Sequence, residues 1–148
     1  MTMDNKDQEL ETASVTLVEG MHFVGAIDRF RLDLDAAEHV GGKGAGPQPH
    51  SLLLVALASC TAMDVISILR KKRQQVSGLT VEVQGSRADE HPKVYTQIEV
   101  LYRVRGNNVS PQAVERSIEL SRTRYCPVMA TLSKVAEVST RYEIEEEI

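Results

Sequence analysis

The stretch GPQPHSLLLVALASCTAMDVISILRKKR, residues 46–73, decides the fold. Between Leu52 and Leu69 its polar residues are few or small, so no side of a helix built from it would suit water. Pro49 fits a first helical position, where its missing N–H costs little, and the basic residues 70–73 suit the negative end of the helix dipole. The stretch therefore predicts a central helix from about 47 to 73 that must be covered on every side.

A membrane span is the first alternative for this helix, because its apolar run is close to the roughly 18-residue threshold for crossing a bilayer. Asp64 lies well inside the run, where a carboxylate would be costly in lipid, and amphipathic strand-like segments follow it. These features favour the core helix of a soluble protein, without membrane attachment.

Composition narrows the class of protein. A chain of 148 residues with 42% hydrophobic and 26% charged residues is typical of one soluble globular domain. The net charge of −4 argues against binding to nucleic acid or to an anionic membrane. Met1–Glu11 lacks the apolar segment of a signal peptide, which predicts a cytoplasmic protein. In a reducing cytoplasm, two cysteines predict at most a transient, chemically active pair.

The rest of the chain predicts an α+β domain over residues 13–148, preceded by a loose tail at 1–12. Alternating apolar residues predict a three-stranded antiparallel meander up to Leu34, then a flexible glycine-rich loop, and after the central helix a hairpin ending near Val104. Gly78 is the expected stop of the central helix. Ser110–Pro111 opens a second helix, and the chain closes with a strand from Glu137 to Glu145.

The cysteines differ in their predicted surroundings. Cys126 precedes Pro127 and is expected to N-cap a short helix, whose dipole would stabilise the thiolate and lower the pKa, with Arg122 and Arg124 just upstream. Cys60 lies in the middle of the central helix, one turn before Asp64, and a buried structural thiol is the simplest interpretation of it. On the residues alone, Cys126 is the expected nucleophile.

The two cysteine motifs together resemble those of a known family. An apolar helix containing ALASCTAMDVISIL, residues 56–69, followed later by YCPV at 125–128, is similar to the OsmC/Ohr family of osmotically inducible and organic hydroperoxide resistance proteins. The resemblance is greatest to the YhfA-like branch and covers nearly the whole chain. It implies an intertwined homodimer in which two long central helices are enclosed by antiparallel six-stranded sheets. A second copy would also supply the cover that the apolar helix needs.

The resemblance also implies a chemistry and a role in stress response. Cys60 would attack a small organic hydroperoxide and become a sulfenic acid, Cys126 would resolve it to a disulfide, and a small dithiol would reduce the disulfide. The site would lie at the subunit interface and would need no cofactor and no metal. This order reverses the one expected from helix electrostatics alone.

The sequence departs from the peroxidase branches at two positions. His50 stands where those enzymes carry a glutamate, and Lys43 is the only cation in the segment where they carry an arginine that pairs with the thiolate. The nearest arginines are Arg29 and Arg31. The residues expected to support the two catalytic cysteines are therefore Asp64, His50, Lys43, Arg29, Arg31, Arg122 and Arg124.

Two alternatives remain open at this stage. The fold could serve a non-catalytic thiol redox sensor or a dimer that binds a small molecule. A metal site is disfavoured, because the chain has no CxxC or HxxxH spacing.

Overall fold

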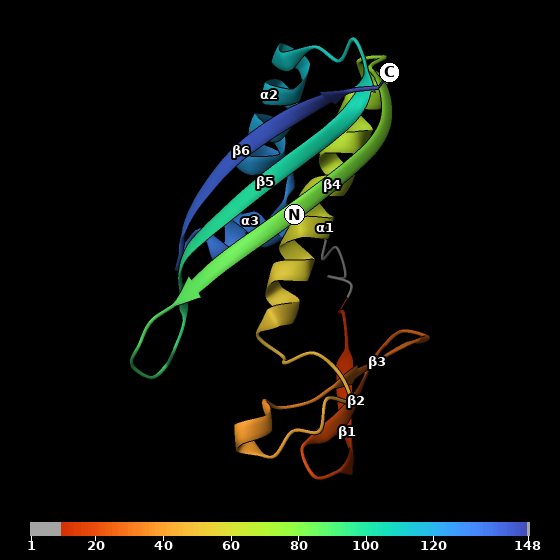
Figure 1. Cartoon of the computed structure of the whole chain (residues 1–148). Coiled ribbons are helices and arrows are strands. Elements are labelled where there is room, and N and C mark those ends of the chain that lie inside the picture. The colour runs from red at the N-terminus through yellow and green to blue at the C-terminus, as the bar shows by residue number, and fades with distance from the viewer. Residues whose placement is uncertain (1–9, 148) are drawn as a thin grey trace, which may run out of the picture. The chain divides into compact units, whose positions relative to one another are not determined.

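The computed structural model describes residues 10–147, and contacts within the chain divide it into two compact units, residues 1–52 and 53–148. The predicted tail lies largely outside the described residues, and the prediction of a single domain over 13–148 stays a prediction. The elements follow the order β1, β2, β3, η1, α1, β4, β5, α2, η2, α3 and β6 (Figure 1).

The first unit contains the predicted meander. Strands β1 (Ala13–Glu19), β2 (His22–Ile27) and β3 (Phe30–Leu34) form an antiparallel sheet in the order β1-β2-β3. Gly20 takes a positive φ of 53° in the turn between β1 and β2, a conformation that glycine adopts without steric cost. The prediction from alternating apolar residues is confirmed.

The glycine-rich segment after β3 is folded around a buried carboxylate, which corrects the expectation of a flexible loop. The Asp35 side chain accepts backbone N–H bonds from Ala36, Lys43 and Ala45 at 2.8, 3.0 and 3.1 Å. A short 3-10 turn, η1 (Glu38–Val40), lies within the segment. At Gly42 any Cβ would lie 1.7 Å from the Ala36 carbonyl oxygen, so only glycine fits there.

Helix α1 (Ser51–Lys71) is shorter than the predicted helix at both ends. Pro49 lies in the turn before it and not in its first turn. At the other end Arg73 has a left-handed φ of 57°, its N–H donates to the Arg70 carbonyl, and the Gln74 N–H donates to the Leu69 carbonyl. This is a Schellman closure with arginine at the usual glycine position. The prediction that Gly78 stops the helix is wrong, because that residue belongs to a strand.

The second unit holds a sheet of β4 (Gln75–Arg87), β5 (Tyr95–Asn107) and β6 (Glu137–Glu146) in the order β4-β5-β6. The pair β4–β5 is the predicted hairpin. Strand β6, however, runs parallel to β5, so the expectation of a purely antiparallel sheet is wrong. The reason is the crossover between them, which carries helix α2 (Pro111–Leu120), the wide turn η2 (Ser121–Tyr125) and helix α3 (Pro127–Leu132) and returns the chain to the starting end of β5.

The core of the second unit lies between the sheet and its helices (Figure 1). Leu57, Val65 and Leu69 of α1 are fully buried in it, as is Tyr102 of β5. The opposite face of the sheet is covered by arginine–glutamate pairs, such as Arg141 with Glu99 at 2.7 Å.

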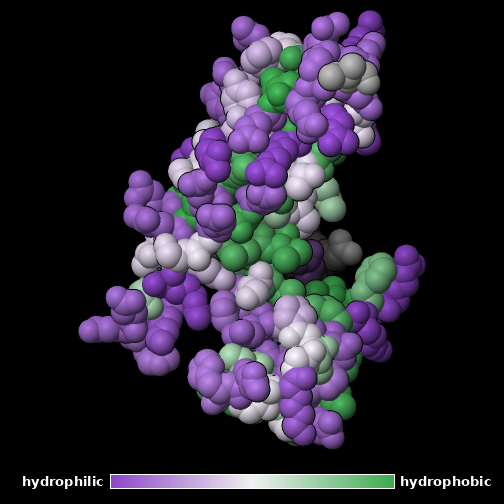
Figure 2. Space-filling model, viewed as in Figure 1, coloured by the Kyte–Doolittle hydropathy of each residue, from purple (hydrophilic) through white to green (hydrophobic). Residues whose placement is uncertain are grey.

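Another side of α1 remains uncovered within the second unit. Val55 and Met63, about two turns apart on one face of the helix, are 62% and 67% exposed, Leu53 on a different face is 44% exposed, and Figure 2 shows hydrophobic side chains at the surface along this helix. Single surface hydrophobes are ordinary, but a row of them on one helix is not. The predicted cover on every side is therefore incomplete in a single chain.

The Asp35 carboxylate generates a prediction about pH. Backbone N–H bonds from Lys43 and Ala45 lower the pKa of Asp35. The pKa of Asp35 in the folded protein is below the ordinary carboxyl value of about 3.9. The ionised side chain therefore stabilises the folded protein above about pH 3.9, and this stabilisation is lost as the pH falls through the lower pKa of the folded state. We expect Asp35→Ala to remove protection from hydrogen exchange at the Lys43 and Ala45 amides at neutral pH.

The matched control is Glu38→Ala, which removes an exposed carboxylate from the same segment. Its amide protection factors should equal those of the unmodified protein. Equal protection in Asp35→Ala would contradict the role given to this carboxylate.

Candidate active site

The two thiols occupy different structural positions in the second unit. Cys60 lies on α1 and is half-buried, whereas Cys126 is only 3% exposed. Cys126 is the N-cap of α3, since its Sγ accepts the Met129 N–H at 3.3 Å. The predicted capping role of Cys126 is thus confirmed.

Cys60 is one of the groups that act on the pKa of the Cys126 thiol, so the structure brings both predicted thiols to one site. Burial, the neighbouring Cys60 and the negative charge of Asp64 together raise the pKa of Cys126 to about 11, against the Met129 N–H, which lowers it.

This result corrects the expectation of a lowered pKa at Cys126. The helix N-terminus acts in the predicted direction, through the Met129 N–H, but desolvation is the larger effect. The sequence shows the cap but not the depth at which the cap is buried.

A wide turn places Cys126. In η2 the chain follows a π-helical path, and the Cys126 N–H donates to the Ser121 carbonyl at 2.9 Å, five residues back. Turns of this kind are rare in proteins, and those that occur often lie at functional sites. No feature of the sequence predicted this one.

A buried polar chain lies beside the thiols. The Tyr102 hydroxyl is 2.7 Å from Thr61 Oγ1, which is 2.8 Å from Ser121 Oγ, and Ser121 Oγ donates to the Asp64 carboxylate at 2.8 Å. Tyr102, Thr61 and Ser121 have no exposed surface. Of these residues only Asp64 was predicted, although a threonine inside an otherwise apolar helix is a signal that could have pointed to a partner.

The two arginines upstream of Cys126 make other contacts. Arg122 donates to the Val138 carbonyl of β6 at 2.7 Å, and the Arg124 guanidinium lies 5.6 Å from the centre of the Tyr125 ring. The groups that act most strongly on the Cys126 thiol are instead Cys60, the Met129 N–H and Asp64. A direct role for Arg122 or Arg124 at the thiols stays a prediction.

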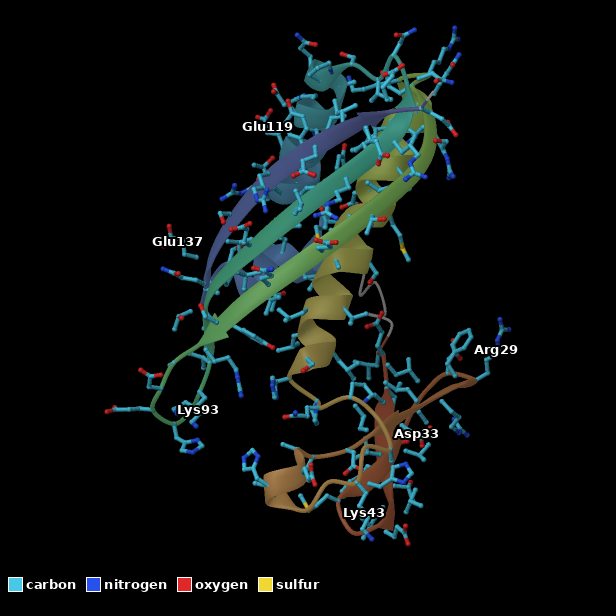
Figure 3. All side chains as sticks on the ribbon, viewed as in Figure 1. Arg29, Asp33, Lys43, Lys93, Glu119 and Glu137 are labelled. Atoms are coloured by element: carbon cyan, nitrogen blue, oxygen red, sulfur yellow. The ribbon has the colours of Figure 1, made fainter. Side chains whose placement is uncertain are left out.

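The remaining predicted residues belong to the first unit, whereas both thiols belong to the second. Arg29 is at the tip of the β2–β3 hairpin, with its guanidinium 5.0 Å from the centre of the Phe30 ring, and Arg31 is exposed on β3. Figure 3 labels Arg29 and also Lys43, which lies in the segment after β3 with its side chain exposed. His50 is half-buried just before α1. Their roles as site residues stay predictions.

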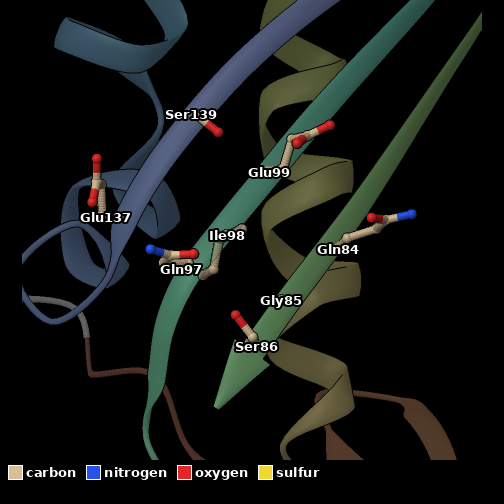
Figure 4. Close-up of a pocket in the computed structure, with 8 residues that line it drawn as sticks. All are labelled: Gln84, Gly85, Ser86, Gln97, Ile98, Glu99, Glu137 and Ser139. Carbon is tan, nitrogen blue, oxygen red and sulfur yellow. The ribbon is translucent and has the colours of Figure 1, made fainter. Parts of the chain in front are cut away.

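One hollow of the second unit is separate from the candidate site. Figure 4 shows it on the outer face of the sheet, with a volume of about 440 Å³, lined by Gln84, Gly85, Ser86, Gln97, Ile98, Glu99, Glu137 and Ser139. It contains neither cysteine, and its Glu99 is occupied by Arg141. Within residues 10–147, no three histidine, cysteine or acidic side chains are grouped so that they could hold a metal ion.

Fold and site together define a class of α+β proteins in which a cysteine on a long core helix meets a second cysteine that caps a short one. The family described as OsmC-like protein matches residues 42–141, and the chain belongs to this family. Helix α1 is long and apolar enough to cross a membrane by length and composition, but in this family it is the core helix of a soluble protein.

Individual relatives agree with this assignment. Protein YhfA of Escherichia coli K12 is 34% identical over 133 residues, which cover 89% of this chain and 96% of YhfA. A hypothetical protein from Aquifex aeolicus VF5 has a TM-score of 0.85 and 28% identity over 95% of this chain and 100% of its own. An organic hydroperoxide resistance protein, OsmC, from Legionella pneumophila has a TM-score of 0.68 at 14% identity, over 93% of this chain and 99% of its own, which shows a shared fold alone.

The raised pKa of Cys126 predicts slow alkylation. A rise from the ordinary 9.0 to about 11 lowers the thiolate fraction at neutral pH about 100-fold. We expect iodoacetamide to modify Cys126 of the reduced protein at least that much more slowly than in urea-unfolded protein, with each cysteine followed by peptide mass spectrometry.

The unfolded protein in this comparison is the control for the reagent and for the peptide. Equal rates for folded and unfolded Cys126 would show that the thiol is neither buried nor held protonated.

Proposed function

We propose that the protein is a cytoplasmic thiol-dependent peroxidase that reduces small organic hydroperoxides through Cys60 and Cys126. The observation that carries this proposal is that the fold brings Cys60 of α1 close enough to Cys126 to act on its ionisation. Two cysteines held close together by the fold can form a disulfide with little rearrangement of the chain.

The surroundings of each thiol support the order of steps. Cys60 is the more exposed of the two thiols, so its sulfur is the one available to an oxidant. Its lone pair attacks the distal peroxide oxygen, the O–O bond breaks, an alcohol leaves, and Cys60 becomes a sulfenic acid. The Cys126 sulfur then attacks Cys60, water leaves, and a disulfide forms. A small dithiol reduces it by exchange.

The apolar surroundings of Cys60 support an organic substrate. Cys60 is one of the partly buried residues that pack against the core cluster, and so are Val128 and Leu132 of α3, the helix that Cys126 caps. An alkyl or aryl group beside the peroxide would bury apolar surface there, whereas hydrogen peroxide has no such group.

We also propose that the active protein is an intertwined homodimer with the site at the subunit interface. The support is the exposed apolar row of Val55 and Met63 on one face of α1, with Leu53 exposed on another face, which the second unit leaves in water. Residues from the first unit, among them His50, Lys43, Arg29 and Arg31, would then have a second chain from which to reach the thiols.

The second candidate function is a thiol redox sensor, or a dimer that binds a small molecule on the same fold. The observation that favours it is the protonated Cys126, because a thiol with a pKa of about 11 would resolve a sulfenic acid slowly. His50, which stands where the peroxidase branches carry a glutamate, also favours this second candidate function.

The peroxidase proposal predicts the behaviour of two variants. We expect the reduced protein to consume cumene hydroperoxide in the presence of a dithiol far faster than a free thiol does, Cys60→Ser to lose this activity, and Cys126→Ser to accumulate a sulfenic acid that dimedone traps. Stopped-flow kinetics and mass spectrometry measure both.

Hydrogen peroxide is the control substrate, and the protein should consume it more slowly. If every form reacts no faster than a free thiol, the peroxidase proposal is wrong and the sensor or binding function takes its place.

The dimer proposal predicts that the unmodified protein has twice the mass of one chain by light scattering. Met63→Lys places a charge in the exposed apolar row and should shift the protein toward monomer. Gln84→Lys, on the outer face of the sheet, is the matched control and should remain a dimer. A monomeric unmodified protein would contradict the proposal, whatever the stability of Met63→Lys.

A further inference from the structure

The buried polar chain has a direction that hydrogen-bond chemistry determines. The Asp64 carboxylate accepts from Ser121, and a serine has only one hydroxyl hydrogen to give. Ser121 must therefore accept from Thr61, and Thr61, having given its own hydrogen, must accept from Tyr102. All three hydroxyl hydrogens thus point toward Asp64, an arrangement in which each bond strengthens the next.

The polar chain of Tyr102, Thr61, Ser121 and Asp64 also joins the two elements that carry the thiols. Asp64 and Thr61 belong to α1, where Cys60 is one turn before Asp64. Ser121 begins the η2 turn, and its carbonyl accepts the Cys126 N–H at 2.9 Å. The side chain of Ser121 therefore holds the carboxylate while its backbone holds the second cysteine.

We propose that this polar chain is a positioning device that holds the Asp64 carboxylate near the thiols and fixes the η2 turn that carries Cys126, so that the negative charge of Asp64 adds to the burial that opposes ionisation of Cys126. The inference rests on the proposed function for its purpose. Tyr102, Thr61 and Ser121 are positioning residues, since they act on the thiols through Asp64.

The charges around Cys126 are consistent with this role. From α1 it faces Cys60 and Asp64, and from β5 the Tyr102 hydroxyl, whose own pKa is raised first by burial. The positive charge of Arg122, on η2, acts at Tyr102. A negative charge near a thiol opposes its ionisation, so removal of the Asp64 charge must lower the pKa of Cys126.

The device has a chemical use in the proposed cycle. A protonated Cys126 is a poor nucleophile, which protects it from direct oxidation while Cys60 waits for peroxide. When Cys126 attacks the sulfenic acid of Cys60, its proton leaves with the hydroxyl of that group as water, and the new S–S bond completes the balance. The negative charge of Asp64 would influence the pH dependence of this disulfide-forming step.

The test is an alkaline NMR titration of the full-length reduced protein labelled with ¹³C at the cysteine Cβ, which follows each thiol without peroxide or reagent. We expect Asp64→Asn to lower the titration midpoint of Cys126 by about 0.3 pH unit, a ~2-fold larger thiolate fraction at neutral pH. Glu119→Gln is the matched control, since it removes an exposed carboxylate that pairs with Arg116 on α2 (Figure 3) and should leave the midpoint unchanged.

A second pair of variants separates positioning from packing. Thr61→Val keeps the volume of the side chain but breaks the polar chain, and should lower the Cys126 midpoint by less than Asp64→Asn does. Thr61→Ser keeps the hydroxyl and should retain the original midpoint. A purely structural role would change stability in these variants without moving the midpoint.

The outcomes distinguish this inference from the proposed function. A Cys126 midpoint that is unchanged or raised in Asp64→Asn overturns the inference, even if the protein proves to be a peroxidase. A lowered midpoint together with no peroxide consumption in any form supports the positioning of Asp64 and overturns the proposed function instead.

Discussion

The burial of α1 is the constraint on which the rest of the structure depends. One face of this helix packs into the core of the β4-β5-β6 sheet, with Leu57, Val65 and Leu69 fully buried. The crossover through α2 and α3 lies in that core as well, and it brings the chain back as a parallel strand. Because Cys126 lies in this crossover and Cys60 on α1, the packing that buries the helix also brings the thiols together.

The site illustrates a competition between two electrostatic effects on one thiol. A helix N-terminus stabilises a thiolate, typically by a fraction of a kcal/mol to about 2 kcal/mol, and the Met129 N–H at Cys126 does act in that direction. Desolvation of a nearly fully buried thiol acts against ionisation and is the larger effect here. This balance leaves the Cys126 thiol protonated at neutral pH, and in the proposed function the more exposed Cys60 is the thiol that meets the oxidant.

The polar chain beside the thiols has a cost that the fold must offset. Three hydroxyls without exposed surface would destabilise the core if any lacked a partner, but each is bonded in sequence to the Asp64 carboxylate. Within the described residues no buried side-chain polar atom is left without a partner. A network so completely satisfied constrains the relative positions of α1, β5 and η2, and with them the geometry of the thiol pair.

The sequence alone determined the meander, the central helix, the β4–β5 hairpin, the capping role of Cys126 and the family, because these follow from local periodicity, caps and motif spacing. It did not reveal the parallel β6, the π-helical η2 turn, the partners of Thr61 or the folded segment around Asp35, all of which depend on contacts between distant residues. The pKa of Cys126 is the sharpest case. The capping role of Cys126 can be predicted from the neighbouring Pro127. The protonation of Cys126 depends instead on burial and on Cys60 and Asp64, which only the tertiary structure brings close.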